Sequence, residues 1–158
     1  MSPGKQQWQA VLVICLGELF SSPTFASLRE RMLLLSVRTR LDPLKALDRA
    51  RKHFEENGLT LVETIAHLHG KGGFTEIRVS GGKLVGKAKY DSKLVLDELT
   101  KDARSRFGFE PVSFGLHFHA PLGHVDVMVS NEKPVEVALD SVEYDAQVKE
   151  FADKLPKA

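Results

Sequence analysis

The spacing of apolar residues between positions 32 and 158 switches repeatedly between that of a β-strand and that of an α-helix. Residues 33–41 form a β-rich run, and Asp42-Pro43 follows as a helix N-cap with proline at the first helical position. The next apolar residues recur at helical spacing: Leu44, Leu47, Ala50 and Phe54. Gly58 is expected to end this helix as its C′ residue.

Two strands are predicted next, over 59–69 and 74–80, and Gly81-Gly82 is a hairpin signal that leads into a strand over 83–90. Ser92 is the expected cap of a second helix, which Gly108 ends. The apolar face of that helix is Leu96, Leu99, Ala103 and Phe107. Further strands are predicted over 112–120, 124–130 and 135–139, and a last helix over 142–155.

The region from about residue 42 to 85 matches the region 50 positions later without a gap. The matched positions include two glycines and two pairs of histidines: Gly58 with Gly108, His67 with His117, and His69 with His119. The predicted domain, 32–158, is therefore a tandem duplication of βαββ units at about 33–82 and 83–132, with a closing βα at 133–158. Its expected fold class is α+β, with a mainly antiparallel sheet and helices on one face.

Residues 1–31 lie outside the repeat and are interpreted as an N-terminal extension, either a loosely packed helix or a signal-like segment. Lys5 and the apolar run 10–16 imitate a secretory signal, which would make residues 1–26 a leader. Glu18 near the end of that run argues against export. A cytoplasmic location is the favoured expectation.

Composition narrows the class of partner. The formal net charge is +1, so the chain offers no electrostatic basis for binding nucleic acid or an anionic membrane. A single cysteine, Cys15, excludes an internal disulfide framework and a cysteine-based zinc site. No apolar run is long enough to span a membrane. The expected partner is a metal ion or a small molecule, together with further copies of the chain.

Strand periodicity places the histidines of the second hairpin on the face away from the core. If 120–123 is the loop, His119 lies opposite His124 and His117 lies opposite Asp126. Three imidazoles and a carboxylate on one patch suit a divalent transition metal such as Zn²⁺, Fe²⁺ or Mn²⁺. The predicted metal ligands are His117, His119, His124 and Asp126. A metal-free acid–base site and a polar face without a ligand remain open alternatives.

The first hairpin repeats this geometry less completely. His69 is expected to oppose Phe74, and His67 to oppose Glu76. A second candidate site is therefore His67, His69 and Glu76. Two cations on the same face, Arg78 and Lys87, are candidate ligand-binding residues, and Lys87 competes for the Glu76 carboxylate. His53, near the end of the first helix, is expected to interact with the helix dipole.

Each copy resembles the core of the S-adenosylmethionine decarboxylases of bacterial and archaeal type. The spacing from Gly58 to His67 is similar to that family's, and so is the spacing from Gly108 through His117 to Gly123. The resemblance implies a duplicated α+β fold and an enzyme that cleaves its own backbone at a Glu-Ser bond to form a pyruvoyl cofactor. By spacing, that serine would fall at Lys83 or Lys133, so no pyruvoyl group is expected.

Three functional hypotheses follow, and the residues name no substrate. The first is a metal- or small-ligand-binding protein with a histidine-rich site, which a metal-dependent enzyme would also have. The second is a non-catalytic or regulatory homo-oligomer. Its interface would use apolar residues among the charges, namely Ile65, Phe74, Val85 and Met128. The third is a divergent lyase of the decarboxylase type, which would require self-cleavage near Ser80 or Ser130.

Overall fold

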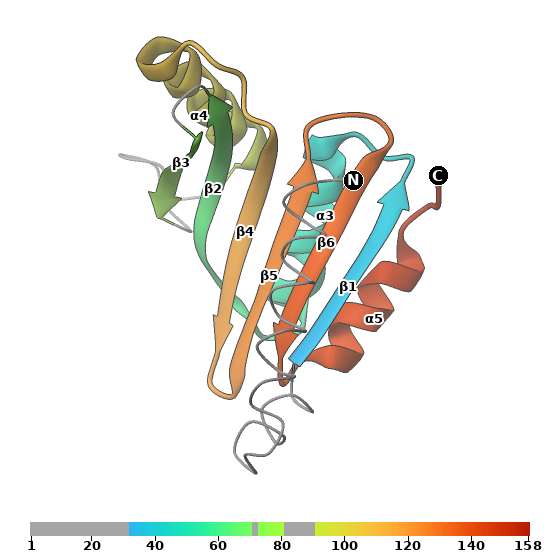
Figure 1. Ribbon diagram of the computed structural model, residues 1–158. Helices are drawn as coiled ribbons and strands as arrows, with labels where there is room; N and C mark the ends of the chain where they lie inside the picture. The colour runs from blue at the N-terminus through green and yellow to red at the C-terminus, as the bar shows by residue number, and fades with distance from the viewer. Residues whose placement is uncertain (1–31, 71–72, 81–90) are drawn as a thin grey trace, which may run out of the picture.

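The computed structural model describes residues 32–70, 73–80 and 91–158, which form one antiparallel sheet and three helices (Figure 1). The elements follow the chain as β1 (Met32–Thr39), α3 (Pro43–Glu56), β2 (Thr60–Gly70), β3 (Gly73–Ser80), α4 (Ser92–Phe107), β4 (Ser113–Ala120), β5 (Gly123–Ser130), β6 (Val135–Val142) and α5 (Asp145–Lys154). The six strands lie in the order β1-β6-β5-β4-β2-β3. The expected α+β class is confirmed.

All three helices lie against the same face of the sheet (Figure 1). Helix α3 packs on the central strands β2, β4 and β5, α4 packs on β2 and β3, and α5 packs on β1 and β6. Alternate strand residues and the inner faces of the helices form the core between the two layers. Its largest fully buried side chains are Phe54, Phe118, Leu47, Leu68, Leu99, Leu116 and Leu139. The opposite face, which carries His67, His117, His124, Asp126 and Asp140, is called the outer face below. None of the described helices is long and apolar enough to cross a membrane.

The predicted start and end of the first helix are confirmed. The Asp42 carboxylate accepts a hydrogen bond from the backbone N–H of Lys45 at 2.9 Å, and Pro43 occupies the first helical position. Beyond the helix, Gly58 adopts a positive φ of 86°, a conformation that glycine adopts without steric cost. The N-cap and the end of this helix could be predicted from the sequence because they depend on neighbouring residues alone.

Two predictions about the second helix are wrong. The N-cap is Asp91 rather than Ser92, because the Asp91 carboxylate accepts from the backbone N–H of Leu94 at 3.1 Å. Ser92 is buried, and its hydroxyl accepts from Arg51 Nε at 3.4 Å. Phe107 is 39% exposed rather than part of the core, since the helix ends there and the chain turns away at Gly108, whose φ is 73°.

The last strand is longer than predicted, and the last helix is shorter. Strand β6 continues to Val142 instead of ending at residue 139, and α5 begins at Asp145. The added residues pair on both sides, with β1 through Leu34↔Asp140 and with β5 through Asp126↔Asp140. Pairing with two neighbours extends the strand beyond the point where its apolar alternation fades.

The two histidine hairpins share one register. Strand β2 pairs with β3 through His67↔Glu76, and β4 pairs with β5 through His117↔Asp126, which are the same positions shifted by the offset of 50. The duplication itself stays a prediction. The predicted strand 83–90, the Gly81-Gly82 hairpin and the extension 1–31 lie outside the described residues.

Candidate functional site

A row of polar side chains crosses four strands of the outer face. The register places Asp140 opposite Asp126, Asp126 opposite His117, and His117 opposite Glu63, so β6, β5, β4 and β2 each contribute one residue. Side chains opposite each other on antiparallel strands have Cβ atoms about 5 Å apart, which puts each of these groups within reach of the next. The row exists because all four strands keep the same inward and outward alternation.

The three histidines of the second hairpin meet as predicted. His119 lies opposite His124 in the register, and their ring centroids are 6.4 Å apart. The His117 ring lies 4.5 Å from the His119 ring and 5.8 Å from the His124 ring. Strand phase and the connection between the strands decide this arrangement. The register follows the prediction, although Ala120 and Gly123 pair within the strands and only Pro121-Leu122 form the turn instead of the expected loop 120–123.

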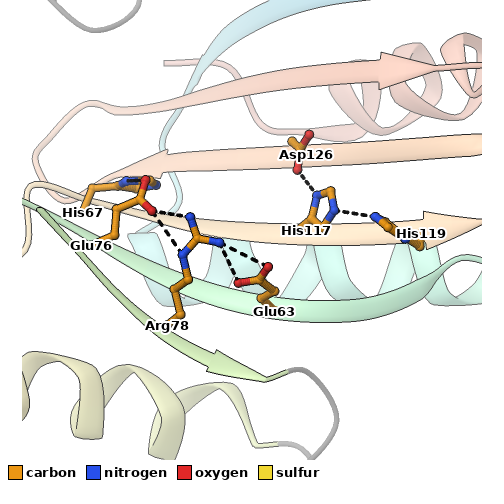
Figure 2. A network of polar contacts seen from close by, with 7 residues as sticks. All are labelled: Glu63, His67, Glu76, Arg78, His117, His119 and Asp126. Carbon is orange, nitrogen blue, oxygen red and sulfur yellow. Dashed lines mark hydrogen bonds and ion pairs between the residues drawn. The ribbon is translucent and has the colours of Figure 1, made fainter.

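His117 is held from both ends of its ring (Figure 2). Its Nδ1 contacts Oδ1 of Asp126, and its Nε2 lies 2.6 Å from Nε2 of His119. The other oxygen of Asp126, Oδ2, lies 3.5 Å from Nε2 of His124. Asp126 therefore links the His117–His119 pair to His124.

One group in the described part of the chain has the geometry to hold a metal ion. His124, Asp126 and Asp140 each offer one ligand atom, and these atoms all lie within 4.8 Å of one another. Two of the four predicted ligands belong to this group, whereas His117 and His119 lie beside it. Asp140 was not predicted, because the strand was expected to end at residue 139. The alternation of Val137 and Leu139 toward the core was the signal that could have placed the next residue on the outer face.

The surroundings of Asp140 disfavour the charged form of its carboxyl group. Its Oδ1 is buried and has no hydrogen-bond partner. Burial is the main cause that raises the pKa of the Asp140 carboxyl, and the neighbouring Asp126 carboxylate raises it further. His124 and His117 lower the pKa and only partly offset these two effects. A cation bound beside Asp140 would favour the charged carboxylate and so offset both effects.

In the first hairpin an arginine occupies the place between the carboxylates (Figure 2). The predicted pairs His67↔Glu76 and His69↔Phe74 are confirmed. The Arg78 guanidinium, however, lies 2.5 Å from Glu76 and 3.1 Å from Glu63. The second candidate site of His67, His69 and Glu76 therefore already contains a positive charge. The other predicted cation, Lys87, lies outside the described residues.

His67 is the most enclosed histidine of this hairpin. Its side chain is 19% exposed, and Nδ1 lies 3.5 Å from Oε1 of Glu76. Nε2 lies above Gly115, where an added Cβ would be only 3.3 Å away. Burial is the main cause that lowers the pKa of His67, and the effect of Arg78 in the same direction is opposed by Glu76. His67 is therefore held in its neutral form more strongly than a solvated histidine.

His53 lies on the helical side and takes no part in the outer-face site. Its Nε2 lies 2.9 Å from the carbonyl oxygen of Gln147, and its ring packs against Phe54 and Phe151. His53 lies in the last turn of α3, and its expected interaction with the helix dipole stays a prediction.

Comparison of the chain with models of protein families, with curated proteins and with solved structures gave no significant match. The resemblance to the S-adenosylmethionine decarboxylases stays a prediction. Ser130, one of the two serines considered for self-cleavage, ends β5 and accepts a hydrogen bond from the backbone N–H of Glu136 at 2.8 Å.

Proposed function

We propose that this protein binds one divalent transition-metal ion on the outer face, through His124, Asp126 and Asp140. The observation that carries the proposal is the buried Oδ1 of Asp140, which lacks a hydrogen-bond partner beside a second carboxylate. An unpaired buried carboxylate oxygen is costly, and a cation is the partner that satisfies two opposed carboxylates at once.

The donor set indicates the kind of ion. One imidazole and two carboxylates suit Zn²⁺, Fe²⁺ and Mn²⁺, and the two carboxylates balance the charge of a divalent ion. Three protein ligands leave at least one coordination position for water or a small molecule. Catalytic zinc sites share this incomplete protein coordination, whereas structural zinc sites have four protein ligands. The open coordination position would therefore let a small ligand bind to the ion, which is a requirement for metal-dependent catalysis.

Metal analysis of the untagged protein tests this proposal. We expect about one ion per chain by elemental analysis, and loss of that ion in His124→Ala. A matched control is Asp97→Asn, which changes an exposed carboxylate on α4 and should leave the metal content unchanged. A wild-type protein without stoichiometric metal, whose thermal stability is also unaffected by chelator, would contradict the proposal.

A second candidate function is assembly through the outer face. Phe74 is 68% exposed there, and Ile65 and Met128 are half-buried among the polar groups. Apolar side chains exposed among polar groups suit an interaction surface. In this reading the protein is a homo-oligomer with histidines at the contact, so its size should change between about pH 5.5 and about pH 7.5. A monomer at both pH values would reject the interface.

A further inference from the structure

The two ring nitrogens of His117 are both occupied, and the chemistry of their partners fixes where the protons lie. A carboxylate only accepts hydrogen bonds, so His117 Nδ1 carries a proton and donates it to Oδ1 of Asp126. A neutral His117 then has its lone pair on Nε2. His119 therefore donates from its own Nε2 across the 2.6 Å contact. The chain of donors runs from His119 through His117 to Asp126.

Asp126 connects this chain to the ion-binding group. One of its oxygens accepts from His117, and the other lies 3.5 Å from His124 Nε2, on the side of the proposed ion. Metal-ligating side chains commonly depend on such outer hydrogen bonds for their orientation. Here the partner of the ligating carboxylate is an imidazole.

We propose that His117 is a positioning residue, which holds Asp126 in the orientation that binds the ion and does not itself bind the ion. This inference rests on the proposed metal site and specifies its ligand set. His124 is the one imidazole ligand, Asp126 and Asp140 supply oxygen, and His119 fixes the ring of His117. Of the four ligands expected from the sequence, two then act through hydrogen bonds.

The competing arrangement, in which His117 and His119 bind an ion between them, lacks ligands. Two imidazole nitrogens on a tetrahedral ion are about 3.3 Å apart, as follows from metal–nitrogen bonds of about 2.0–2.1 Å. The two Nε2 atoms are closer than this, at 2.6 Å, which suits a shared proton. On the β2 side, the carboxylate opposite His117 belongs to Glu63, and it is held by Arg78 at 3.1 Å. On the β5 side, Asp126 already accepts from Nδ1 of His117.

Counting the coordinated imidazoles tests the inference directly. The full chain is loaded with one equivalent of Cu²⁺, and electron spin echo spectroscopy resolves how many imidazole rings bind the ion. We expect one ring in the wild type. His117→Asn keeps a donor near the position of Nδ1 and removes the ring, so the one-ring spectrum should remain with nearly unchanged affinity. His117→Ala should keep the same spectrum and bind Cu²⁺ about 10- to 100-fold more weakly.

The remaining variants distinguish a failure of the positioning role of His117 from a failure of the metal site itself. His124→Ala should lose the imidazole signal, and His69→Asn, which changes a histidine outside the proposed ligand set, should behave as wild type. A wild-type spectrum with two or three rings, one of which disappears in His117→Asn, would overturn the positioning role while leaving the metal site intact. A wild-type protein that binds no Cu²⁺ would overturn the metal site itself, and the inference with it. Far-ultraviolet circular dichroism of each variant shows that the fold is retained.

Discussion

Asp140→Asn should be more stable than the wild type in the absence of metal and less stable than the wild type in its presence. In the metal-free protein the Asp140 and Asp126 carboxylates are directly opposed on neighbouring strands. Opposed like charges destabilise a sheet by about 0.2–1 kcal/mol, and the buried Oδ1 of Asp140 favours the upper end of that range. Asp140→Asn should therefore raise the free energy of unfolding by about 1 kcal/mol in chelator, which corresponds to roughly 3 °C in Tm.

With metal the sign reverses. An ion present at about 100 times its Kd stabilises the wild type by about 2.7 kcal/mol. Loss of a ligating oxygen should weaken binding at least as much as loss of an outer partner, about 100-fold at the upper end. The variant then gains only about 0.4 kcal/mol from the same ion concentration. The wild type should therefore be more stable than Asp140→Asn by about 1 kcal/mol in metal, the difference between these contributions.

Thermal unfolding of both proteins in chelator and in a titration of Zn²⁺ or Mn²⁺ measures these differences. The crossing of the two stability curves is the diagnostic result, and Asp97→Asn should show no crossing. A variant that is less stable than wild type in chelator would refute the repulsion between the carboxylates. A variant that gains as much stability from metal as the wild type would refute the role of Asp140 as a ligand.

The stability advantage of Asp140→Asn in chelator should depend on pH. The pKa of Asp140 is raised in the folded protein, so the native state binds this proton more tightly than the unfolded state does. Asp140 therefore lowers stability as pH rises from the usual aspartate range to the raised pKa, and its full cost is present above that value. The advantage of Asp140→Asn in chelator should accordingly shrink when the pH falls through this window.

Three further predictions concern residues around the site. The lowered pKa of His67 means that the native state binds its proton less tightly than the unfolded state, so stability should fall as pH drops below the usual histidine range. His67→Gln should reduce that fall, and an NMR titration of the imidazole should place its midpoint below that of a solvated histidine; a midpoint at or above it would contradict the prediction. Arg78→Met should free Glu63 and Glu76 and raise the bound metal from about one to about two ions per chain, whereas Arg104→Met, which breaks an Arg–Glu pair away from the site, should leave it at one. An unchanged ratio in Arg78→Met would show that His67 and its carboxylates do not form a latent metal site. Gly123→Ala should cost about 1–3 kcal/mol in urea unfolding, because the added Cβ would clash with the backbone carbonyl of Val142, while the exposed Leu122→Ala should have little effect; equal stability of the two variants would refute the clash.

The sequence by itself determined the local structure and the faces of the second hairpin. Capping by Asp42 and the stop at Gly58 depend on residues within one turn, so they could be predicted from neighbours. Strand alternation has a period of two, and it placed His117 opposite Asp126 once the short turn was recognised. The same periodicity was sufficient to put the histidines away from the core.

Only the tertiary structure decided the full set of neighbours of each strand, and this brought the candidate ligands together. Asp140 lies in the candidate site because β6 continues to Val142, where it pairs with β1 on one side and β5 on the other, and the distant strand β1 is not apparent as a partner from local sequence. Arg78 lies between two carboxylates in the first hairpin because the pairing of β2 with β3 places Glu63 on one side of it and Glu76 on the other. Periodicity fixes the face on which a side chain lies, whereas pairing between strands fixes which charges meet on that face, and the stability of each pairing depends on the whole sheet.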